Sequence, residues 1–369
     1  MRFAFPQPCA RLFRALLALT FGLIYNAAPR PVIAQSVFDS IGQEINGIFE
    51  RTKPAMVRVR SKSDLLTLAG SGFFIDDRGT ILTAATLLGQ SPQVSVQIDG
   101  KWHPAEVLAR DTRSGVALLK VTDDLTPFLT LGDTEDLRRG SAVIAVGYSR
   151  DQPASPTWGL VTGLDFRYEQ RFFPTTHIRA DVQISPGQVG GPLLDTQGDV
   201  IGLMVASIDS GKTIYALPIE AAKKVVHEVK EHGTARHGWV GVGVQPFRDS
   251  EGRPGGVSIS QLFPDTPAAR SGLEPGDVVL TIDGRQIEDP GDIADASFFS
   301  TVGSQLQVTV RREGKEMKFS FVVMERPRAQ GGRSTLPIPA NPELEERRLA
   351  PGTRPSITDG PVTTGAQEK

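Results

Sequence analysis

The sequence predicts an all-β double barrel followed by a smaller α+β domain. Between about residues 57 and 218, short alternating or apolar runs are separated by Gly, Asp and Pro, which is the pattern of closely spaced strands. The content of 38 Gly and 27 Pro in 369 residues also favours turn-rich β structure. This density of strands suits two six-stranded barrels with a cleft between them. The strand candidates are residues 57–60, 70–75, 81–83, 93–98, 105–110 and 116–121 for the first barrel, and 143–147, 159–164, 176–183, 200–207 and 213–217 for the second.

Helical segments flank the predicted barrels. Apolar residues recur at helical spacing between residues 38 and 49, and residues 219–232 carry a similar stripe. From residue 239 to about 324, strands alternate with two short helices, which indicates the α+β domain. The tail is rich in Pro, Gly, Arg, Glu and Thr and has too few apolar residues to order itself. The predicted segments are 1–34 (presequence), 35–51 (N-terminal helical segment), 52–220 (double barrel), 221–237 (helix and linker), 238–326 (α+β domain) and 327–369 (disordered tail).

The N-terminus has the features of a secretory signal peptide. Three arginines precede a largely apolar run at 15–28, and small side chains suit cleavage before Gln35. The alternative is an uncleaved inner-membrane anchor formed by residues 15–28, but this run is shorter than the roughly 20 residues of a spanning helix. We therefore expect residues 1–34 to direct export.

Cysteine content and charge exclude several classes of function. The only cysteine, Cys9, lies in the presequence, so a mature chain would have no disulfide, no thiol nucleophile and no cysteine metal site. A disulfide-free exported chain is compatible with a bacterial periplasm. Removal of residues 1–34 leaves 36 basic and 42 acidic residues, a net charge near −6, without any prominent basic block. Nucleic acid is therefore not an expected partner.

One glycine-rich stretch organises the double barrel. Residues 184–193 read I-S-P-G-Q-V-G-G-P-L, with three glycines between two prolines. Because Gly permits left-handed dihedrals and Pro fixes φ, such a turn can aim backbone N–H groups at one point and form an oxyanion hole. The stretch resembles the nucleophile loop of trypsin-like serine proteases, in particular the HtrA/DegP family, where it reads N-P-G-N-S-G-G-P-L. Val189 stands in the place of the nucleophile.

Further motifs follow in the order of that family. Residues 70–83 resemble G-S-G-F-I-I…G-Y-I-L-T, after which the family continues N-N-H-V-V, and here Thr86 stands in the place of the histidine. Residues 111–120 resemble D-x-x-T-D-L-A-V-L-K, and Gly115 stands in the place of the aspartate. The resemblance implies a double barrel of the chymotrypsin/trypsin type in which all three triad positions are substituted.

These substitutions predict the loss of catalysis. Nucleophilic attack needs an oxygen or sulfur, a base within hydrogen-bond reach and a group that orients the base. Val189 has no lone pair, Thr86 is no base near neutral pH, and Gly115 has no side chain. We therefore expect no catalytic residue at these positions.

A relocated triad is not indicated either. Ser185 is expected on the wrong side of the turn, and His103 and His177 fall in strand patterns away from the motifs, as ordinary surface or half-buried residues. Two roles remain open for the glycine frame. It can serve folding alone, or it can retain an oxyanion loop at Gly187, Gln188 and Val189 that still binds peptide carbonyls.

The α+β domain carries a second recognisable loop. The run W-V-G-V, residues Trp239, Val240, Gly241 and Val242, resembles the carboxylate-binding loop of PDZ domains, which reads Y-L-G-V in the HtrA family. In that reading, backbone N–H groups bind a peptide C-terminus and the next strand pairs with the ligand. Ile293, on the second predicted helix, would line the pocket for the last ligand residue. The alternative is a PDZ domain that only packs on the barrels.

The sequence thus predicts a catalytically inactive HtrA/DegP-like homologue that binds polypeptides or protein C-termini, as a chaperone-like binder, scaffold or regulatory subunit in the cell envelope. The alternative is an active trypsin-like serine endopeptidase for envelope protein quality control. The resemblance implies a homo-oligomer, commonly a trimer formed partly through residues 38–49, or a hetero-oligomer with active relatives. No cofactor is expected. No metal site is expected either, because His227, His232 and His237 are spaced by five and do not share a helical face.

Overall fold

The computed structural model describes residues 32–62, 67–89, 91, 93–122, 126–168, 171–248 and 251–327. The expected signal peptide, apart from its last three residues, and the expected tail beyond residue 327 lie outside the described residues, as does the anchor considered at 15–28. Within the described ranges, no helix combines the length and apolar character that crossing a membrane requires.

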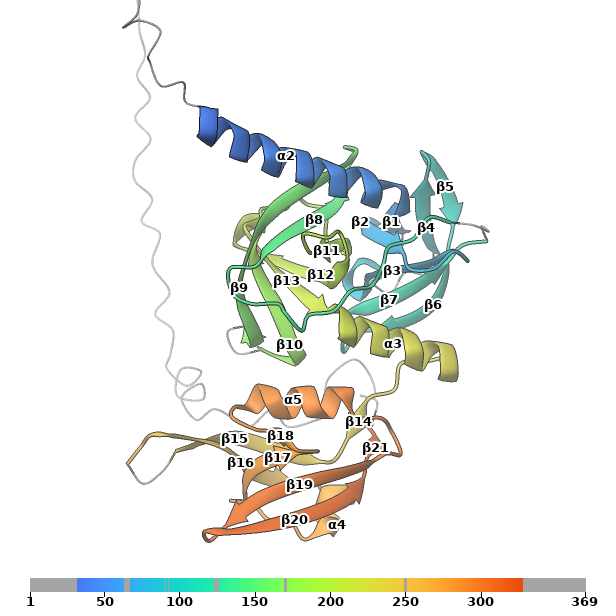
Figure 1. Ribbon diagram of the computed structural model, residues 1–369. Coiled ribbons are helices and arrows are strands. Elements are labelled where there is room, and N and C mark those ends of the chain that lie inside the picture. The colour runs from blue at the N-terminus through green and yellow to red at the C-terminus, as the bar shows by residue number, and fades with distance from the viewer. Residues whose placement is uncertain are drawn as a thin grey trace, which may run out of the picture. The chain divides into compact units, whose positions relative to one another are not determined.

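In the first barrel, the two strands at the edges of the sheet follow one another directly in the chain. Its strands are β1 (Met56–Lys62), β2 (Thr67–Phe74), β3 (Thr80–Ala84), β4 (Gln93–Ile98), β5 (Lys101–Pro104), β6 (Glu106–Asp111) and β7 (Val116–Lys120), in the order β5-β4-β1-β2-β3-β7-β6. Only Ala105 separates β5 from β6, and its N–H donates to the carbonyl of Val94 at 3.0 Å. The two end strands are therefore one bent strand, and the sheet closes with six strand positions (Figure 1).

The second barrel closes through a strand pair. Its strands are β8 (Ala142–Tyr148), β9 (Ala154–Tyr168), β10 (Arg171–Asp181), β11 (Pro192–Leu194), β12 (Val200–Ile208) and β13 (Thr213–Pro218). The order β10-β13-β12-β11-β8-β9 closes because β9 and β10 pair antiparallel. The predicted six-stranded barrel is confirmed, although the sequence pattern missed the three-residue strand β11.

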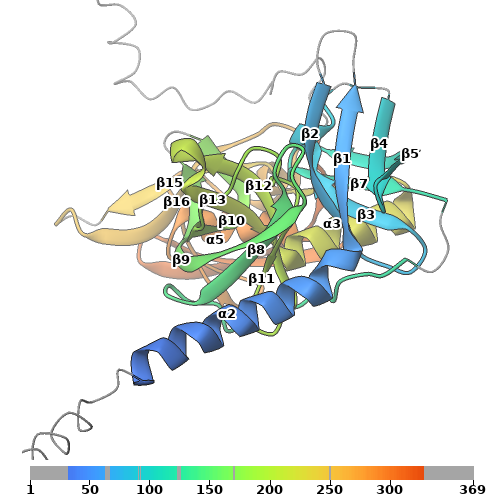
Figure 2. The ribbon, with the colours of Figure 1, turned by 90° about the horizontal axis from the view of Figure 1, so that it is seen from above.

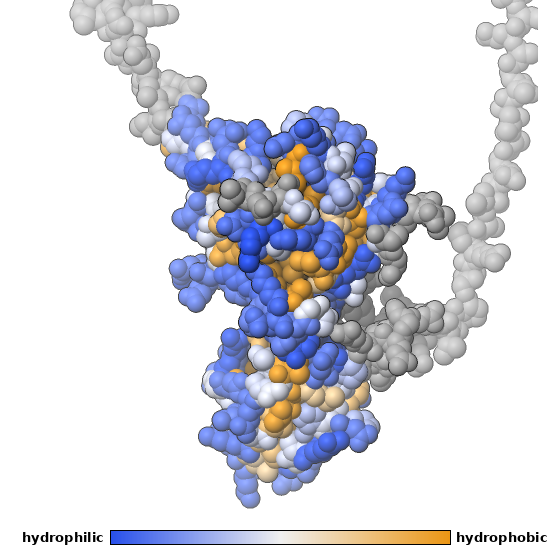
Figure 3. Space-filling view, turned by 90° about the vertical axis from the view of Figure 1, so that its right-hand side faces the viewer, coloured by the Kyte–Doolittle hydropathy of each residue, from blue (hydrophilic) through white to orange (hydrophobic). Residues whose placement is uncertain are grey.

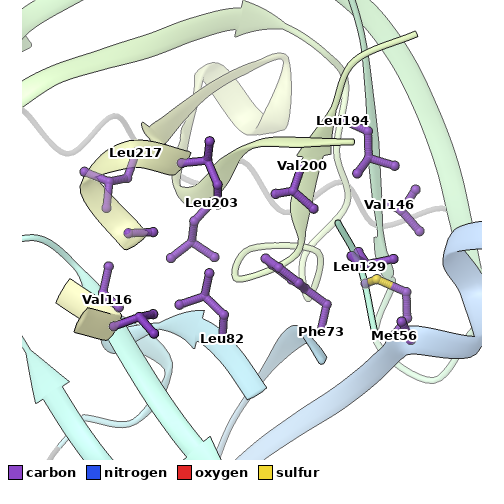
Figure 4. Packing of buried hydrophobic residues seen from close by; sticks show 14 of the residues in the cluster. Met56, Phe73, Leu82, Val116, Leu129, Val146, Leu194, Val200, Leu203 and Leu217 are labelled. Atoms are coloured by element: carbon purple, nitrogen blue, oxygen red, sulfur yellow. The ribbon is translucent and has the colours of Figure 1, made fainter. Parts of the chain in front are cut away.

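A shared hydrophobic core joins the two barrels. Figure 4 shows apolar side chains from strands of both barrels facing one another. Each barrel also has an interior core of its own, made mainly of Val, Ile, Leu and Ala. On the face shown in Figure 3, by contrast, hydrophilic residues cover most of the surface and hydrophobic residues gather in narrow strips. The labelled members of the shared core are Met56, Phe73, Leu82, Val116, Leu129, Val146, Leu194, Val200, Leu203 and Leu217.

Two helices pack on the barrels, one short 3-10 turn joins α2 to β1, and two others connect strands. Helix α2 (Val32–Thr52) begins three residues before the predicted segment, and its C-terminal part buries Ile48 and Phe49 in the shared core. Figure 2 shows the other half of α2 extending beyond the barrel, where Phe38 is 73% exposed. Helix α3 (Ile219–His232) has the predicted bounds and ends at a left-handed glycine. The 3-10 turns are η1 (Lys53–Ala55), η2 (Ala85–Leu87) and η3 (Asp209–Gly211).

The α+β domain follows the linker. Its main sheet has the order β15-β16-β17-β19-β20, β18 pairs with β17, and β14 pairs with β21. Strand β15 lies at one edge of this sheet and pairs only with β16 among the described residues. The elements are β14 (Gly238–Trp239), β15 (Val242–Arg248), β16 (Pro254–Leu262), α4 (Pro267–Ser271), β17 (Val278–Ile282), β18 (Arg285–Gln286), α5 (Pro290–Phe299), β19 (Gln305–Arg312), β20 (Lys315–Val322) and β21 (Met324–Glu325).

Helix α5 contacts the second barrel as well as its own domain. The carboxylate of Asp295 accepts hydrogen bonds from the hydroxyl of Thr175, at 2.5 Å, and from the hydroxyl and N–H of Thr176, at 2.7 and 2.6 Å. On the same helix Phe298 is fully buried and belongs to the core shared by the barrels, whereas Ile293 belongs to the core of the α+β domain. The helix therefore joins two hydrophobic cores.

A buried histidine lies beside this contact on β10. His177 is 2% exposed, which is deeper than the surface or half-buried position expected for it. Its Nδ1 lies 2.8 Å from the carbonyl of Thr175, and its ring stacks on Phe173 with centroids 4.2 Å apart. Burial lowers the pKa of His177 to about 4, although the Thr175 carbonyl and the charge of Asp295 favour the protonated ring.

The lowered pKa of the buried His177 predicts that the protein loses stability in mild acid. An unfolded histidine titrates near pH 6.5 and the buried one near 4, so the unfolded chain takes up the proton first. The free energy of unfolding should therefore fall as pH drops from about 6.5 to 4, by about 3 kcal/mol. Urea titrations at several pH values measure this slope. His177→Asn keeps a donor for the carbonyl and should flatten the slope, whereas the matched control His103→Asn, on β5, should not. The same slope in both variants would contradict the assignment.

Candidate functional site

Ser71 of β2 joins the glycine-rich loop to both barrels. Its Oγ donates to the carbonyl of Gly187 at 2.8 Å and accepts from the N–H of Tyr148 at 2.8 Å. Its N–H donates to the carbonyl of Val189 at 2.9 Å, and its own carbonyl accepts from the hydroxyl of Thr83 at 2.7 Å. Ser71 is fully buried, so its polar atoms depend on these partners, and the loop is held against β2.

The loop itself is a tight turn closed by Gln188. The N–H of Gln188 donates to the carbonyl of Ser185 at 3.1 Å, and its side-chain oxygen accepts from the N–H of Ser185 at 2.6 Å. Gln188 is buried, at 2% exposure. Gly187 has φ +105°, and a Cβ there would lie 2.6 Å from the carbonyl oxygen of Tyr148. Only glycine fits this position, because both the dihedral and the space exclude a side chain.

The two N–H groups on either side of Gln188 have no acceptor. Among the residues that the structure describes, nothing accepts a hydrogen bond from the N–H of Gly187 or of Val189. The N–H of Gln188 between them is engaged within the turn and is not available. Of the three expected loop residues, two therefore offer backbone donors of the kind that bind a carbonyl oxygen or an oxyanion.

Val189 lies at the rim of the second barrel's core. Its side chain is partly buried and packs against the interior cluster of that barrel. Gly190 follows with φ +87°, and its N–H donates to the carbonyl of Met204 on β12 at 2.8 Å. A Cβ on Gly190 would collide with the carbonyl oxygen of Ser71 and lie 2.6 Å from the Thr83 hydroxyl. The close approach of loop and β2 thus depends on Gly190.

Thr86 and Gly115 lie on segments that meet beside this loop. Thr86 is exposed in η2, and the N–H of its neighbour Ala85 donates to the carbonyl of Gly115 at 2.7 Å. Gly115 has φ +81°, and a Cβ there would lie 3.4 Å from Val205 of β12. The structure therefore brings the three segments together, but it gives them no nucleophile, base or carboxylate at these positions.

The turn before Gly115 carries a carboxylate with another partner. Asp111 lies 2.9 Å from Nε2 of His237 in the linker and accepts from the hydroxyl of Ser114 at 2.5 Å. Burial would raise the pKa of Asp111, but the hydrogen bond and charge of His237 outweigh it and hold the pKa below its usual value. This pair ties the turn to the linker, away from Val189.

The remaining histidines do not gather into a site. His103 lies on β5, His177 is enclosed on β10, His227 is exposed, and His232 lies 3.9 Å from Glu228. Within the described ranges, no three His, Cys, Asp or Glu side chains are grouped so as to hold a metal ion. The Ser185 hydroxyl has no histidine partner there either.

The loop at the start of the α+β domain also presents backbone donors. The N–H groups of Val240 and Gly241 have no acceptor among the described residues, whereas their carbonyls accept from Ala268 and Phe263 at 3.0 and 2.9 Å. Gly241 has φ +83°, and a Cβ there would collide with Thr266. The two carbonyls therefore anchor the loop to the start of α4 and to the residue after β16.

Other expected peptide-binding residues are more enclosed. Trp239 is 9% exposed, pairs with Met324 in the β14–β21 ladder and contacts the ring of Phe263 at 5.4 Å. Ile293 of α5 is 8% exposed in the domain core, and Val240 and Val242 pack partly buried against that core. The structure therefore places Ile293 beside the loop, whereas Trp239 serves mainly to fix it.

Comparisons with known proteins agree with this architecture. A trypsin-like peptidase domain model matches residues 70–203, and a PDZ domain model matches residues 238–323. A probable periplasmic serine endoprotease DegP-like of Halomonas elongata is 33% identical over 343 residues, which cover 87% of this chain and 72% of that protein. The chain belongs to the HtrA/DegP-like serine protease family.

Further members extend this result. A probable periplasmic serine endoprotease DegP-like of Pseudomonas fluorescens is 31% identical over 280 residues, and the match covers 73% of this chain but 58% of that protein. Among solved structures, the HtrA-type protease AlgW with a tripeptide has a TM-score of 0.69 at 27% identity, over 78% of this chain and 99% of that one. AlgW with a decapeptide gives 0.65 at 26% identity, over 77% and 99%.

Sequence reasoning missed some residues that hold the site of this HtrA-like chain. The motif at residues 70–83 does not predict a separate role for Ser71, although a small polar residue between two glycines in an apolar strand indicates a buried hydrogen-bonding role. The sequence predicts Gln188 as a member of the oxyanion loop, but its N–H closes the turn instead. The Asp111–His237 pair joins positions 126 residues apart, and no local pattern reveals such a contact.

The close approach of the loop to β2 at Gly190 predicts that a side chain at this position will destabilise the protein. Gly190→Ala should lower the free energy of unfolding by about 2–4 kcal/mol, because it adds a steric clash to the left-handed strain. Gly140→Ala is a matched control: Gly140 has φ +89° and nothing within 4 Å of a new Cβ, so only the strain of about 1 kcal/mol remains. Denaturant unfolding of both variants measures the difference. Equal losses would contradict a close approach at Gly190.

Proposed function

We propose that this chain is a catalytically inactive HtrA/DegP-like homologue that binds polypeptides. The observation that carries the proposal is Val189, an aliphatic side chain packed on the barrel core within the glycine loop where the family has its nucleophilic serine. Thr86 and Gly115 supply neither base nor carboxylate. Loss of a complete triad lowers the rate on the order of 10⁶-fold, which leaves only binding and the backbone donors.

The retained frame supports a binding role for the cleft. Gly187 and Val189 keep free N–H donors, and Ser71 holds both carbonyls of this stretch in place. A peptide carbonyl can accept these two bonds without any covalent step. In this proposal, the loop has changed from stabilising a reaction intermediate to holding a polypeptide.

The competing candidate is an active serine endopeptidase for envelope protein quality control. It is favoured by the names of the relatives, which are periplasmic serine endoproteases. Val189 speaks against it because a valine offers no nucleophilic atom. The same names support an exported, periplasmic location for this chain, which agrees with the signal-peptide features of residues 1–34.

The PDZ domain is proposed as the main peptide site. The free N–H groups of Val240 and Gly241 can bind a terminal carboxylate, and the open edge of β15 can pair with an extended ligand. Related AlgW structures contain a tripeptide or a decapeptide, which supports peptide binding in this chain. A short peptide buries little area, so we expect roughly micromolar affinity.

We also propose self-association, through the apolar face that α2 leaves uncovered. On this helix Val37, Phe38 and Ile41 are 53, 73 and 37% exposed, and they continue the stripe that is buried at Ile48. Strand β9, which α2 contacts, exposes further apolar side chains, namely Trp158, Leu160 and Leu164. A hydrophobic surface of this kind on an exported chain favours association with a second copy or an active relative.

Absence of catalysis is directly testable. Purified protein should neither cleave unfolded casein nor react with a fluorophosphonate probe, because Val189 offers no nucleophile. The triple variant Thr86→His, Gly115→Asp, Val189→Ser serves as comparator. It should fold, since Gly115 has space for a side chain, but should cleave slowly because φ +81° misdirects an aspartate there. Cleavage by the unmodified protein, after rigorous removal of contaminating proteases, would refute the proposal.

Peptide binding should require a free C-terminus. Full-length protein titrated by calorimetry with an apolar peptide should bind the free acid at least tenfold more tightly than its C-terminal amide. The reason is that only the carboxylate presents a charged acceptor to the N–H groups of Val240 and Gly241. A peptide with a charged last residue controls for the apolar pocket. Equal binding of acid and amide would move the site away from this loop.

A further inference from the structure

The joint between the first barrel and the PDZ domain brings several positively charged side chains together. Here the β6–β7 turn, α3, the linker and the end of β21 meet. Four permanent cations and the two carboxylates that bind some of them belong to the contacts of this joint. The cations are Arg113, Lys224, Arg236 and Arg326, and the carboxylates are Asp111 and Glu228.

Both carboxylates are already engaged. Glu228, which is 3% exposed on α3, lies 2.9 Å from Nε of Arg236 and 3.8 Å from Nζ of Lys224. Asp111 binds His237 and the hydroxyl of Ser114, as described above. Two of the four cations therefore have acidic partners, and the two remaining arginines do not.

Arg113 and Arg326 are these unpaired arginines. Neither guanidinium has a hydrogen bond or an ion pair among the described residues. Nε of Arg113 is enclosed without an acceptor, while its terminal nitrogens are not enclosed. The guanidinium of Arg326 lies 5.7 Å from the centre of the Trp239 ring.

A short chain of hydrogen bonds holds the two arginines at the same joint. The N–H of Arg326 donates to the carbonyl of His237 at 2.8 Å, and His237 binds Asp111 at 2.9 Å. The N–H of Arg113 in turn donates to Asp111 at 3.2 Å. Both backbones are thereby fixed at this joint, one on a barrel turn and the other at the end of the PDZ domain.

Burial and the charge of Arg326 both disfavour the charged form of Arg113. Burial, followed by the charge of Arg326, lowers the pKa of Arg113 to about 10, and the nearby Asp111 only partly opposes this. Burial also lowers the pKa of Arg326. Two partly desolvated like charges without a counter-ion are costly, and a bound anion would remove that cost.

We propose that a small oxyanion, a phosphate or carboxylate group, binds between Arg113 and Arg326. Guanidinium groups present planar forks that match such anions with paired hydrogen bonds. One arginine comes from the turn that leads to Gly115, and the other follows the last strand of the PDZ domain. The anion therefore bridges the first barrel and the PDZ domain, and Trp239 of the W-V-G-V loop lies against one of its two arginines.

Anion titrations of the full-length protein test this site. Inorganic phosphate, and separately succinate, is compared with chloride at equal ionic strength and pH, using thermal unfolding and calorimetry. We expect a rise in Tm with one of these anions and an affinity that falls at least tenfold in Arg113→Gln and in Arg326→Gln. The control Arg138→Gln, an exposed residue paired only with Asp136, should bind as the unmodified protein does. The more effective anion identifies the group that the site takes.

Two further measurements separate a ligand site from a structural role. Without anion, Arg113→Gln should unfold at the same Tm as the unmodified protein or higher, because it removes repulsion and no native hydrogen bond. In the unmodified protein, phosphate or succinate should slow phenylglyoxal modification of Arg113 and Arg326 but not of Arg138, as mass spectrometry of peptides would show. No rise in Tm beyond chloride, or equal protection of all three arginines, would overturn the proposal.

Discussion

The hydrogen bonds of Ser71 set the geometry on which the rest of the cleft depends. Four polar contacts of this one buried residue reach the glycine loop, the end of β8 and the hydroxyl of Thr83. A buried hydroxyl or amide without partners is costly, so the loop cannot leave β2 without exposing several such groups at once. Gly187 and Gly190 complement this arrangement, because side chains at those positions would overlap the backbone of neighbouring segments.

This arrangement explains how the chain can lose catalytic groups and keep their frame. The hydrogen bonds that hold the loop use backbone atoms and the side chains of Ser71 and Gln188, and none of them involves the side chains of Thr86, Gly115 or Val189. Substitution at those three positions therefore leaves the hydrogen bonds of the loop intact. Gly115 shows the limit of this tolerance. Its left-handed φ of +81° is a conformation that glycine adopts freely and that an aspartate would adopt only with strain.

Much of this fold could be predicted from the sequence, and the exceptions have physical causes. Helix α3 has the predicted bounds because its apolar stripe is regular and Gly233 ends it. The sequence does not predict strand β5, because its four residues show no alternation of apolar and polar side chains. It does not predict β11 either, because three residues are too few to show a pattern. The sequence motifs predict which residues form the site, but they do not predict the contacts that support these residues. Ser71 acts through partners on other strands, and the two unpaired arginines are 213 positions apart in the chain.

Helix α5 has a consequence for how the molecule loses its structure. Its Ile293 side belongs to the PDZ core, and its Phe298 side belongs to the core shared by the barrels, with Asp295 bonded to β10 between them. Neither domain can melt alone without stripping this helix from one hydrophobic environment and leaving a carboxylate or two threonines unsatisfied. The described part of the chain should therefore unfold in a single cooperative transition, so damage in one domain lowers the resistance of the other to proteolysis.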